Sequence, residues 1–172
     1  MGRRDILLDT ISHGLWAFVL LHRHSTVIKF VAGSIFVDSP FLLAGLGLII
    51  QQGAIPDKLP LLVLEAGFLS VVGYALHSIA IWGIMLAVVY IYSKQWIFFV
   101  LGWGFHIAVD IFTHVNDALP LFWPLSKATS RSFVSYWEPD YHSIAFNIFQ
   151  IGSLAIIFTC LYYFRNLNNK RR

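Results

Sequence analysis

The stretch GFHIAVDIFTHVNDALPLFWP, residues 104–124, contains the strongest pattern in the chain. Within it, His106, Asp110 and His114 recur every four residues in an otherwise apolar segment. On a helix, positions i, i+4 and i+8 share one face, with neighbouring Cβ atoms about 6 Å apart. Two imidazoles and a carboxylate are therefore expected to converge there, and such a set of donors suits a divalent metal ion.

The composition around this stretch is that of a membrane protein. Of the 172 residues, 58% are hydrophobic and 12% are charged, whereas soluble domains contain about 25% charged residues. The lysines and arginines lie almost entirely between apolar runs or near the ends, as a bilayer requires. Because they are scattered, they give no indication of nucleic-acid binding. Cys160 is the single cysteine, which excludes a thiolate zinc site.

The apolar runs predict an all-α fold, a polytopic membrane bundle that forms one domain over residues 1–172. The expected spans are approximately 5–21, 27–50, 71–92, 96–114 and 143–164. Asp9 and His13 interrupt the first run, so we interpret it as a retained helix and not as a signal peptide. The run from 61 to 92 exceeds one span. It predicts a tilted helix, or a short interfacial piece before a span that begins near Val71.

The second run contains a predicted break. Asp38-Ser39-Pro40 lies in its middle, and a residue before proline disfavours helical geometry. A broken helix at membrane depth is tolerated where it lines a protein-enclosed cavity, which makes Asp38 a candidate cavity residue. If this run re-enters the bilayer without crossing it, the bundle has four spans. The sequence leaves four and five spans open, and with them the orientation.

Equal distances from the loops place polar residues at matching depths. His13 and Asp38 are equidistant from the first loop, and His77 lies 17 residues before Lys94 whereas Asp110 lies 16 after it. In antiparallel hairpins such pairs lie at one level, so the polar residues are expected to meet toward one membrane face. The expected metal ligands are His13, Asp38, His77, His106, Asp110 and His114. Zinc is the expected ion, with manganese and iron as alternatives.

Each of these residues also has a structural interpretation. A single histidine such as His13 or His77 can form an interhelical hydrogen bond, and Asp38 can cap the helix after it. Asp117 is typical of a turn, and the aromatic-rich segment 115–142 is typical of an interfacial belt. The stripe from 106 to 114 is harder to explain in this way, because its titratable groups have no nearby cation in the sequence.

Residues 104–126 resemble the signature of a family of small inner-membrane proteins classed as metal-dependent hydrolases, which includes the LexA-regulated membrane hydrolases. Shorter motifs resemble the family in the same order: Ser12-His13-Gly14, Asp38 with Pro40, His77-Ser78, and Phe122-Trp123-Pro124. Many members have Pro-Asp-x-Asp at the second motif and an arginine and a threonine before the third. This chain has Val37-Asp38-Ser39 and Tyr74-Ala75-Leu76 there.

The resemblance implies a metal-dependent hydrolase in the cytoplasmic (inner) membrane of a bacterium or an archaeon. His-x-x-x-Asp on a helix is also similar to helical zinc phospholipases C and P1-type nucleases, which points to phosphoester cleavage. We therefore expect a metal-activated water to hydrolyse a phosphoester or another ester of a lipid-like substrate. Asp110 and His114 are the expected catalytic residues, and membrane lipids are the expected partners. The oligomeric state is not indicated.

Two other functions would use the same residues. The His/Asp cluster could serve as a metal or proton relay in transport or sensing, although we find no inverted repeat of the kind common in transporters. It could also be purely structural, with buried polar side chains that hold helices together. The sequence does not exclude either alternative.

Overall fold

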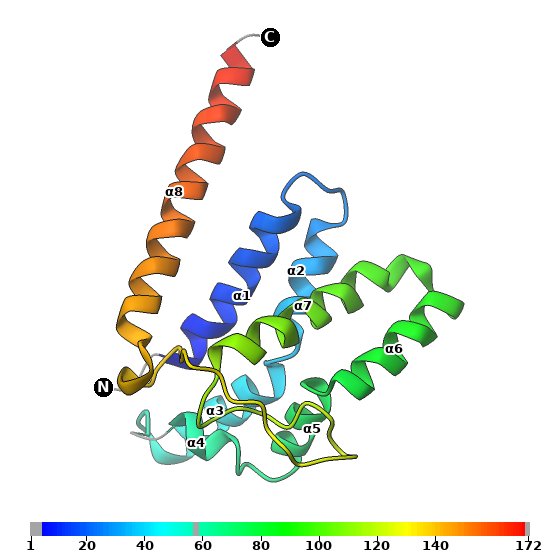
Figure 1. Ribbon diagram of the computed structural model, residues 1–172, viewed down its shortest axis with the longest axis vertical. Helices are drawn as coiled ribbons and strands as arrows, with labels where there is room; N and C mark the ends of the chain where they lie inside the picture. Colours follow the sequence, from blue (N-terminus) through cyan, green and yellow to red (C-terminus); the bar gives the residue numbers. More distant parts are fainter. Residues whose placement is uncertain (1–4, 57–58, 171–172) are drawn as a thin grey trace.

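A computed structural model describes residues 5–56 and 59–170, and this part of the chain is helical between its loops (Figure 1). The expectation of an all-α fold is confirmed for these residues. The elements are α1 Asp5–Leu21, α2 Val27–Phe36, α3 Ser39–Gln52, α4 Leu59–Val63, α5 Phe68–Leu76, α6 Ile79–Tyr92, α7 Ile97–Thr113 and α8 Ser143–Lys170, with 3₁₀ turns at Lys94–Trp96 and Pro139–Tyr141.

Within the described residues, two helical segments are long and apolar enough to cross a membrane, Lys94–Thr113 and Ser143–Leu167. Two bent helix pairs also qualify if each pair is counted as one span. The α2–α3 pair is bent by 52° and the α5–α6 pair by 66°. The described chain therefore offers between two and four candidate spans. Helix α8 continues beyond the expected end at 164, because residues 165–170 contain neither glycine nor proline.

The first bend is the predicted break. Helix α2 ends at Phe36 and α3 begins at Ser39, with Pro40 in the first turn of α3, where a missing N–H is tolerated. The carboxylate of Asp38 makes no capping hydrogen bond, so the structure does not support the capping interpretation. Instead, Asp38 Oδ2 accepts a hydrogen bond of 2.6 Å from Thr10 Oγ1 of α1. The break turns the other carboxylate oxygen toward the protein interior.

The second bend corrects the prediction of one continuous helix over residues 71–92. Helix α5 ends at Leu76 and α6 begins at Ile79, so His77 lies at the break. Ser78 is extended, and its Oγ donates a hydrogen bond of 2.6 Å to Trp123 O. Ile79 N donates to Leu121 O at 2.8 Å. The loop after α7 thus accepts, at Leu121 O, the hydrogen bond that Ile79 N would make internally in a continuous helix.

Helices α2 and α7 pack with their backbones in contact. A Cβ atom built on Gly33 of α2 would lie 1.9 Å from Phe99 O, and one built on Gly102 of α7 would lie 1.9 Å from Phe30 O. Only glycine permits this approach. A core packs beside the contact, made of Val37, Val89, Val100, Trp103 and Ile107. The close crossing brings the break after α2 next to the C-terminal half of α7.

Candidate metal centre

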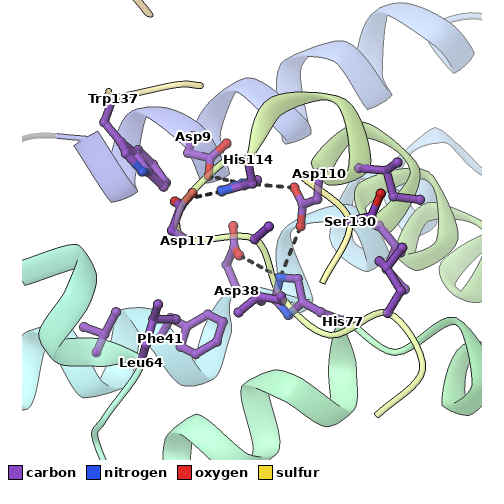
Figure 2. Close-up of a pocket in the computed structure, with 16 residues that line it drawn as sticks. Asp9, Asp38, Phe41, Leu64, His77, Asp110, His114, Asp117, Ser130 and Trp137 are labelled. Carbon is purple, nitrogen blue, oxygen red and sulfur yellow. Dashed lines mark hydrogen bonds and ion pairs between the residues drawn. The ribbon is translucent and has the colours of Figure 1, made fainter. Parts of the chain in front are cut away.

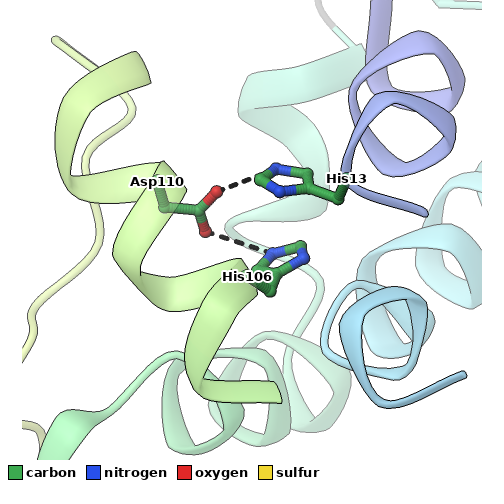
Figure 3. A group of neighbouring side chains, drawn as sticks. All are labelled: His13, His106 and Asp110. Atoms are coloured by element: carbon green, nitrogen blue, oxygen red, sulfur yellow. Dashed lines mark ion pairs between the residues drawn. The ribbon is translucent and has the colours of Figure 1, made fainter. Parts of the chain in front are cut away.

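The predicted metal ligands come together in the structure, although they lie far apart in the sequence. His13 projects from α1, Asp38 and His77 lie at the two helix breaks, and His106 and Asp110 project from α7. Figure 2 shows Asp38, His77, Asp110 and His114 around one space, and Figure 3 shows the Asp110 carboxylate beside the stacked rings of His13 and His106, with one oxygen toward each ring. His13 and His106 are fully buried and stack with ring centroids 3.9 Å apart.

Four of these side chains form a compact group, which we call the first donor group: Asp38, His77, His106 and Asp110. His106 Nε2 lies 3.4 Å from Asp38 Oδ1, 3.3 Å from His77 Nε2 and 3.2 Å from Asp110 Oδ2. His77 Nε2 lies 3.5 Å from Asp38 Oδ1 and 3.3 Å from Asp110 Oδ2. Donors bound tetrahedrally to one ion at about 2.0–2.1 Å lie about 3.3–3.4 Å apart. The group could therefore hold a metal ion.

Hydrogen bonds outside the group orient its ligands. His77 Nδ1 donates to Gly73 O at 2.8 Å, which leaves the lone pair of the neutral ring on Nε2, toward the group. The Thr10 hydrogen bond to Asp38 Oδ2 similarly leaves Oδ1 free to face the histidines. The Nε2 lone pair of His77 thus faces two carboxylate oxygens, Asp38 Oδ1 and Asp110 Oδ2. His106 Nε2 can supply one proton to these three acceptors. A cation would relieve the repulsion that remains among these acceptors.

Several buried atoms of the cluster make no hydrogen bond, which is unusual for buried polar groups. Among the described residues these include Asp9 Oδ1, His13 Nδ1, His13 Nε2, His106 Nδ1 and Asp110 Oδ1. His13 Nε2 and Asp110 Oδ1 lie 3.0 Å apart without hydrogen-bond geometry. A buried carboxylate oxygen without a hydrogen bond is costly unless a cation compensates it, either the charged ring of His13 in the ion pair or a metal ion. The donor chemistry therefore fits a buried metal.

His114 reaches the cluster, but it does not lie on helix α7 as the four-residue spacing predicted. Helix α7 ends at Thr113, and His114 is extended with φ −119° and ψ 137°, so it does not continue the helical stripe. Asp117 explains the ending, because its Oδ1 accepts from Val115 N at 3.3 Å and its Oδ2 from His114 Nδ1 at 2.9 Å. His114 Nε2 nevertheless lies 3.5 Å from Asp110 Oδ1.

The surroundings of His114 favour its charged form. Burial by itself would lower the pKa of His114, but the negative charge of Asp110 and hydrogen bonds to Asp110 and Asp117 raise that pKa well above its ordinary value. Asp117 was interpreted from the sequence as a turn residue, and it does accept a hydrogen bond from the turn. The structure adds that it also fixes the imidazole of His114.

Sequence reasoning missed Asp9. Its side chain is buried on α1, with Oδ1 3.1 Å from His13 Nε2 and Oδ2 3.5 Å from His114 Nε2. A signal was present, since Asp9 and His13 have the same four-residue spacing as the stripe on α7. The two helices therefore face each other with matching His/Asp pairs.

A pocket opens beside the cluster (Figure 2). Asp38, His77, Asp110 and His114 line its polar side. The remaining wall is largely apolar and includes Phe41, Val63, Leu64, Leu119 and Leu121. Trp137 from the loop after α7 also contributes, with its ring centroid 5.2 Å from that of His114. The pocket thus joins an ionic end to an apolar wall, the combination that an amphiphilic ligand requires.

Comparisons with protein-family models, with curated proteins and with solved structures found no match to this chain. The resemblance of residues 104–126 to membrane hydrolases therefore stays an expectation from the sequence. The function has to be argued from the donor atoms, their spacing and the pocket beside them.

Proposed function

We propose that the protein is a membrane-embedded hydrolase that uses a divalent metal, zinc in the first instance, to cleave a phosphoester or another ester of a lipid-like substrate. The observation that supports this most is the spacing of 3.2–3.5 Å in five pairs of donor atoms of the first donor group, each pair with a histidine nitrogen. That spacing suits a small tetrahedral ion. The nitrogen and oxygen donors also suit manganese or iron.

The metal, His114 and Asp117 would each have a different role in the reaction. A divalent metal held by the first donor group would supply Lewis acidity and would make a nearby water acidic enough to react near neutral pH. His114 lines the pocket and directs Nε2 toward Asp110 Oδ1, so its charged ring is placed to donate a proton to the leaving oxygen. Asp117 accepts a hydrogen bond from the other ring nitrogen at 2.9 Å and stabilises that imidazolium. No serine or cysteine nucleophile is needed.

The exterior supports a bilayer location. The large apolar side chains of α8 are exposed, and lipid would cover them: Ile144, Ile148, Phe149, Ile151, Ile156, Tyr162, Tyr163 and Phe164. We propose that α1, the two bent pairs, α7 and α8 form a bundle of four or five spans in a bacterial or archaeal cytoplasmic membrane. An amphiphilic substrate would then enter from the lipid, with its polar group at the metal and its acyl part along the apolar wall.

The test uses the full chain, loaded with zinc in detergent micelles. It is incubated with a phosphomonoester lipid (phosphatidate), a phosphodiester lipid (phosphatidylglycerol) and a neutral ester (diacylglycerol), and products are identified by mass spectrometry. We expect one phosphoester lipid to be hydrolysed, the activity to stop with 1,10-phenanthroline and to return with zinc. His142→Ala, a change at an exposed histidine, should retain it.

Absence of any hydrolysis product would contradict the proposal. Folded, metal-loaded protein that releases no product from any of the three lipids contradicts the hydrolase proposal. If the same preparation moves ions into proteoliposomes, the cluster serves transport. The polar pocket wall would then be part of an ion pathway.

A further inference from the structure

Asp110 divides its two carboxylate oxygens between two sets of histidines. Oδ2 lies 3.3 Å from His77 Nε2 and 3.2 Å from His106 Nε2, within the first donor group. Oδ1 faces the other way, 3.0 Å from His13 Nε2 and 3.5 Å from His114 Nε2. A carboxylate that places each oxygen in a different cluster of nitrogen donors has the arrangement of a bridging ligand.

Asp9 completes a second cluster on the Oδ1 side. Its Oδ1 lies 3.1 Å from His13 Nε2, and its Oδ2 lies 3.5 Å from His114 Nε2. We call Asp9, His13, Asp110 and His114 the second donor group. These side chains come from α1, from α7 and from the loop that follows α7. Like the first group, it combines two carboxylates with two imidazoles.

Most of the buried cluster atoms that lack a hydrogen bond belong to the second donor group. Asp9 Oδ1, His13 Nε2 and Asp110 Oδ1 are buried and make no hydrogen bond, although His13 Nε2 lies within 3.1 Å of both oxygens. A purely structural network would direct an N–H of His13 along one of these short contacts. Carboxylate and imidazole atoms that converge without hydrogen bonds are arranged instead as ligands around a cation.

We propose that the centre is binuclear, with a second divalent cation held by Asp9, His13, His114 and the shared carboxylate of Asp110. This cation would displace the Nε2 proton of His114, so that in the binuclear centre the cation would stabilise the leaving oxygen in place of the imidazolium. This inference rests on the proposed function, because it adds an ion beside the first donor group. Paired ions about 3.5–4 Å apart stabilise the attacking and the leaving oxygens in phosphoryl transfer. Among the substrates proposed above, such a pair therefore favours the phosphoester.

The second site is tested with manganese, because two Mn²⁺ ions joined by a carboxylate couple magnetically whereas an isolated ion gives a six-line spectrum. The full chain in detergent is stripped of metal, titrated with Mn²⁺ and examined by electron paramagnetic resonance. Wild type is expected to bind two equivalents with a coupled spectrum. Asp9→Asn is expected to bind one equivalent with a six-line spectrum, and the exposed control Asp140→Asn to match wild type.

The outcomes separate the two proposals. One equivalent and a six-line spectrum in wild type overturns the second site and leaves the hydrolase proposal intact. No bound manganese in folded wild type overturns both. If Asp9→Asn does not fold, His114→Gln replaces it with the same expected loss of coupling, and a coupled spectrum of two equivalents in that variant contradicts the ligand set.

Discussion

Asp110→Asn is expected to lower hydrolysis by about 10³-fold or more and to release the bound metal. Asp110 is the side chain on which the cluster converges, with His13, His77, His106 and His114 all within 3.5 Å of its oxygens. Asparagine keeps the shape, but it removes the negative charge and directs an amide N–H₂ at nitrogen donors. Loss of a group that acts in the chemical step costs about 10²–10⁴-fold, and loss of the metal adds to that cost.

Asp117→Asn and Asp140→Asn make the same chemical change and serve as comparisons for Asp110→Asn. Asp117 contacts only the outer nitrogen of His114 within the cluster, so Asp117→Asn should cost about 10–100-fold, as outer hydrogen-bond partners of metal ligands do. Asp140 is exposed, and Asp140→Asn should leave activity unchanged. Activity and metal content close to wild type in Asp110→Asn would remove Asp110 from the site.

Gly33→Ala and Gly102→Ala are each expected to destabilise the protein by about 3 kcal/mol, the upper end of the usual cost of overpacking. The new Cβ would meet a backbone carbonyl oxygen at 1.9 Å, and a backbone cannot move aside as a side chain can. Helices α2 and α7 must separate, which displaces Asp38 from His106 and Asp110. Thermal unfolding in detergent should show a melting temperature lower by about 6–12 °C, with weaker metal binding.

Helical glycines without neighbours provide the control. A Cβ on Gly47 of α3 or Gly83 of α6 meets nothing within 4 Å. Alanine at either position should be neutral or stabilise the helix by up to about 1 kcal/mol, because alanine has the higher helix propensity. Equal stability of Gly33→Ala and Gly83→Ala would show that the α2–α7 contact does not hold the site together.

The four-residue spacing of polar residues and their expected depth in the membrane predicted much of the site. The four-residue spacing predicted that His106 and Asp110 share a face of α7, and their side chains meet at 3.2 Å. Counting from Lys94 predicted that His77 reaches the level of Asp110, and these atoms lie 3.3 Å apart. The first result depends on the fixed turn of a helix, and the second on the fixed rise of α6 and α7, with His77 just before the first residue of α6. The break at Asp38 followed from the local geometry before Pro40.

What the sequence did not predict depends on partners distant in the chain. The break at His77 has no glycine or proline to mark it. It is stabilised by hydrogen bonds from Ser78 and Ile79 to the loop at Leu121 and Trp123. The end of α7 before His114 depends on a turn built by Asp117. Such bonds exist only once the loop has folded over the helices, so local propensity cannot reveal them.

The central claim is that the first donor group binds a metal, and the zinc content of the purified protein tests it most directly. Elemental analysis would compare wild type with His77→Ala/His106→Ala and with a control, His22→Ala/His142→Ala, in which two histidines outside the donor groups are lost. Wild type and the control should carry equal amounts of zinc after reconstitution, at least one equivalent, and the first variant should carry about one equivalent less while remaining folded. Wild type without metal after reconstitution with zinc, manganese or iron, or a first variant that retains as much metal as wild type, would contradict the claim.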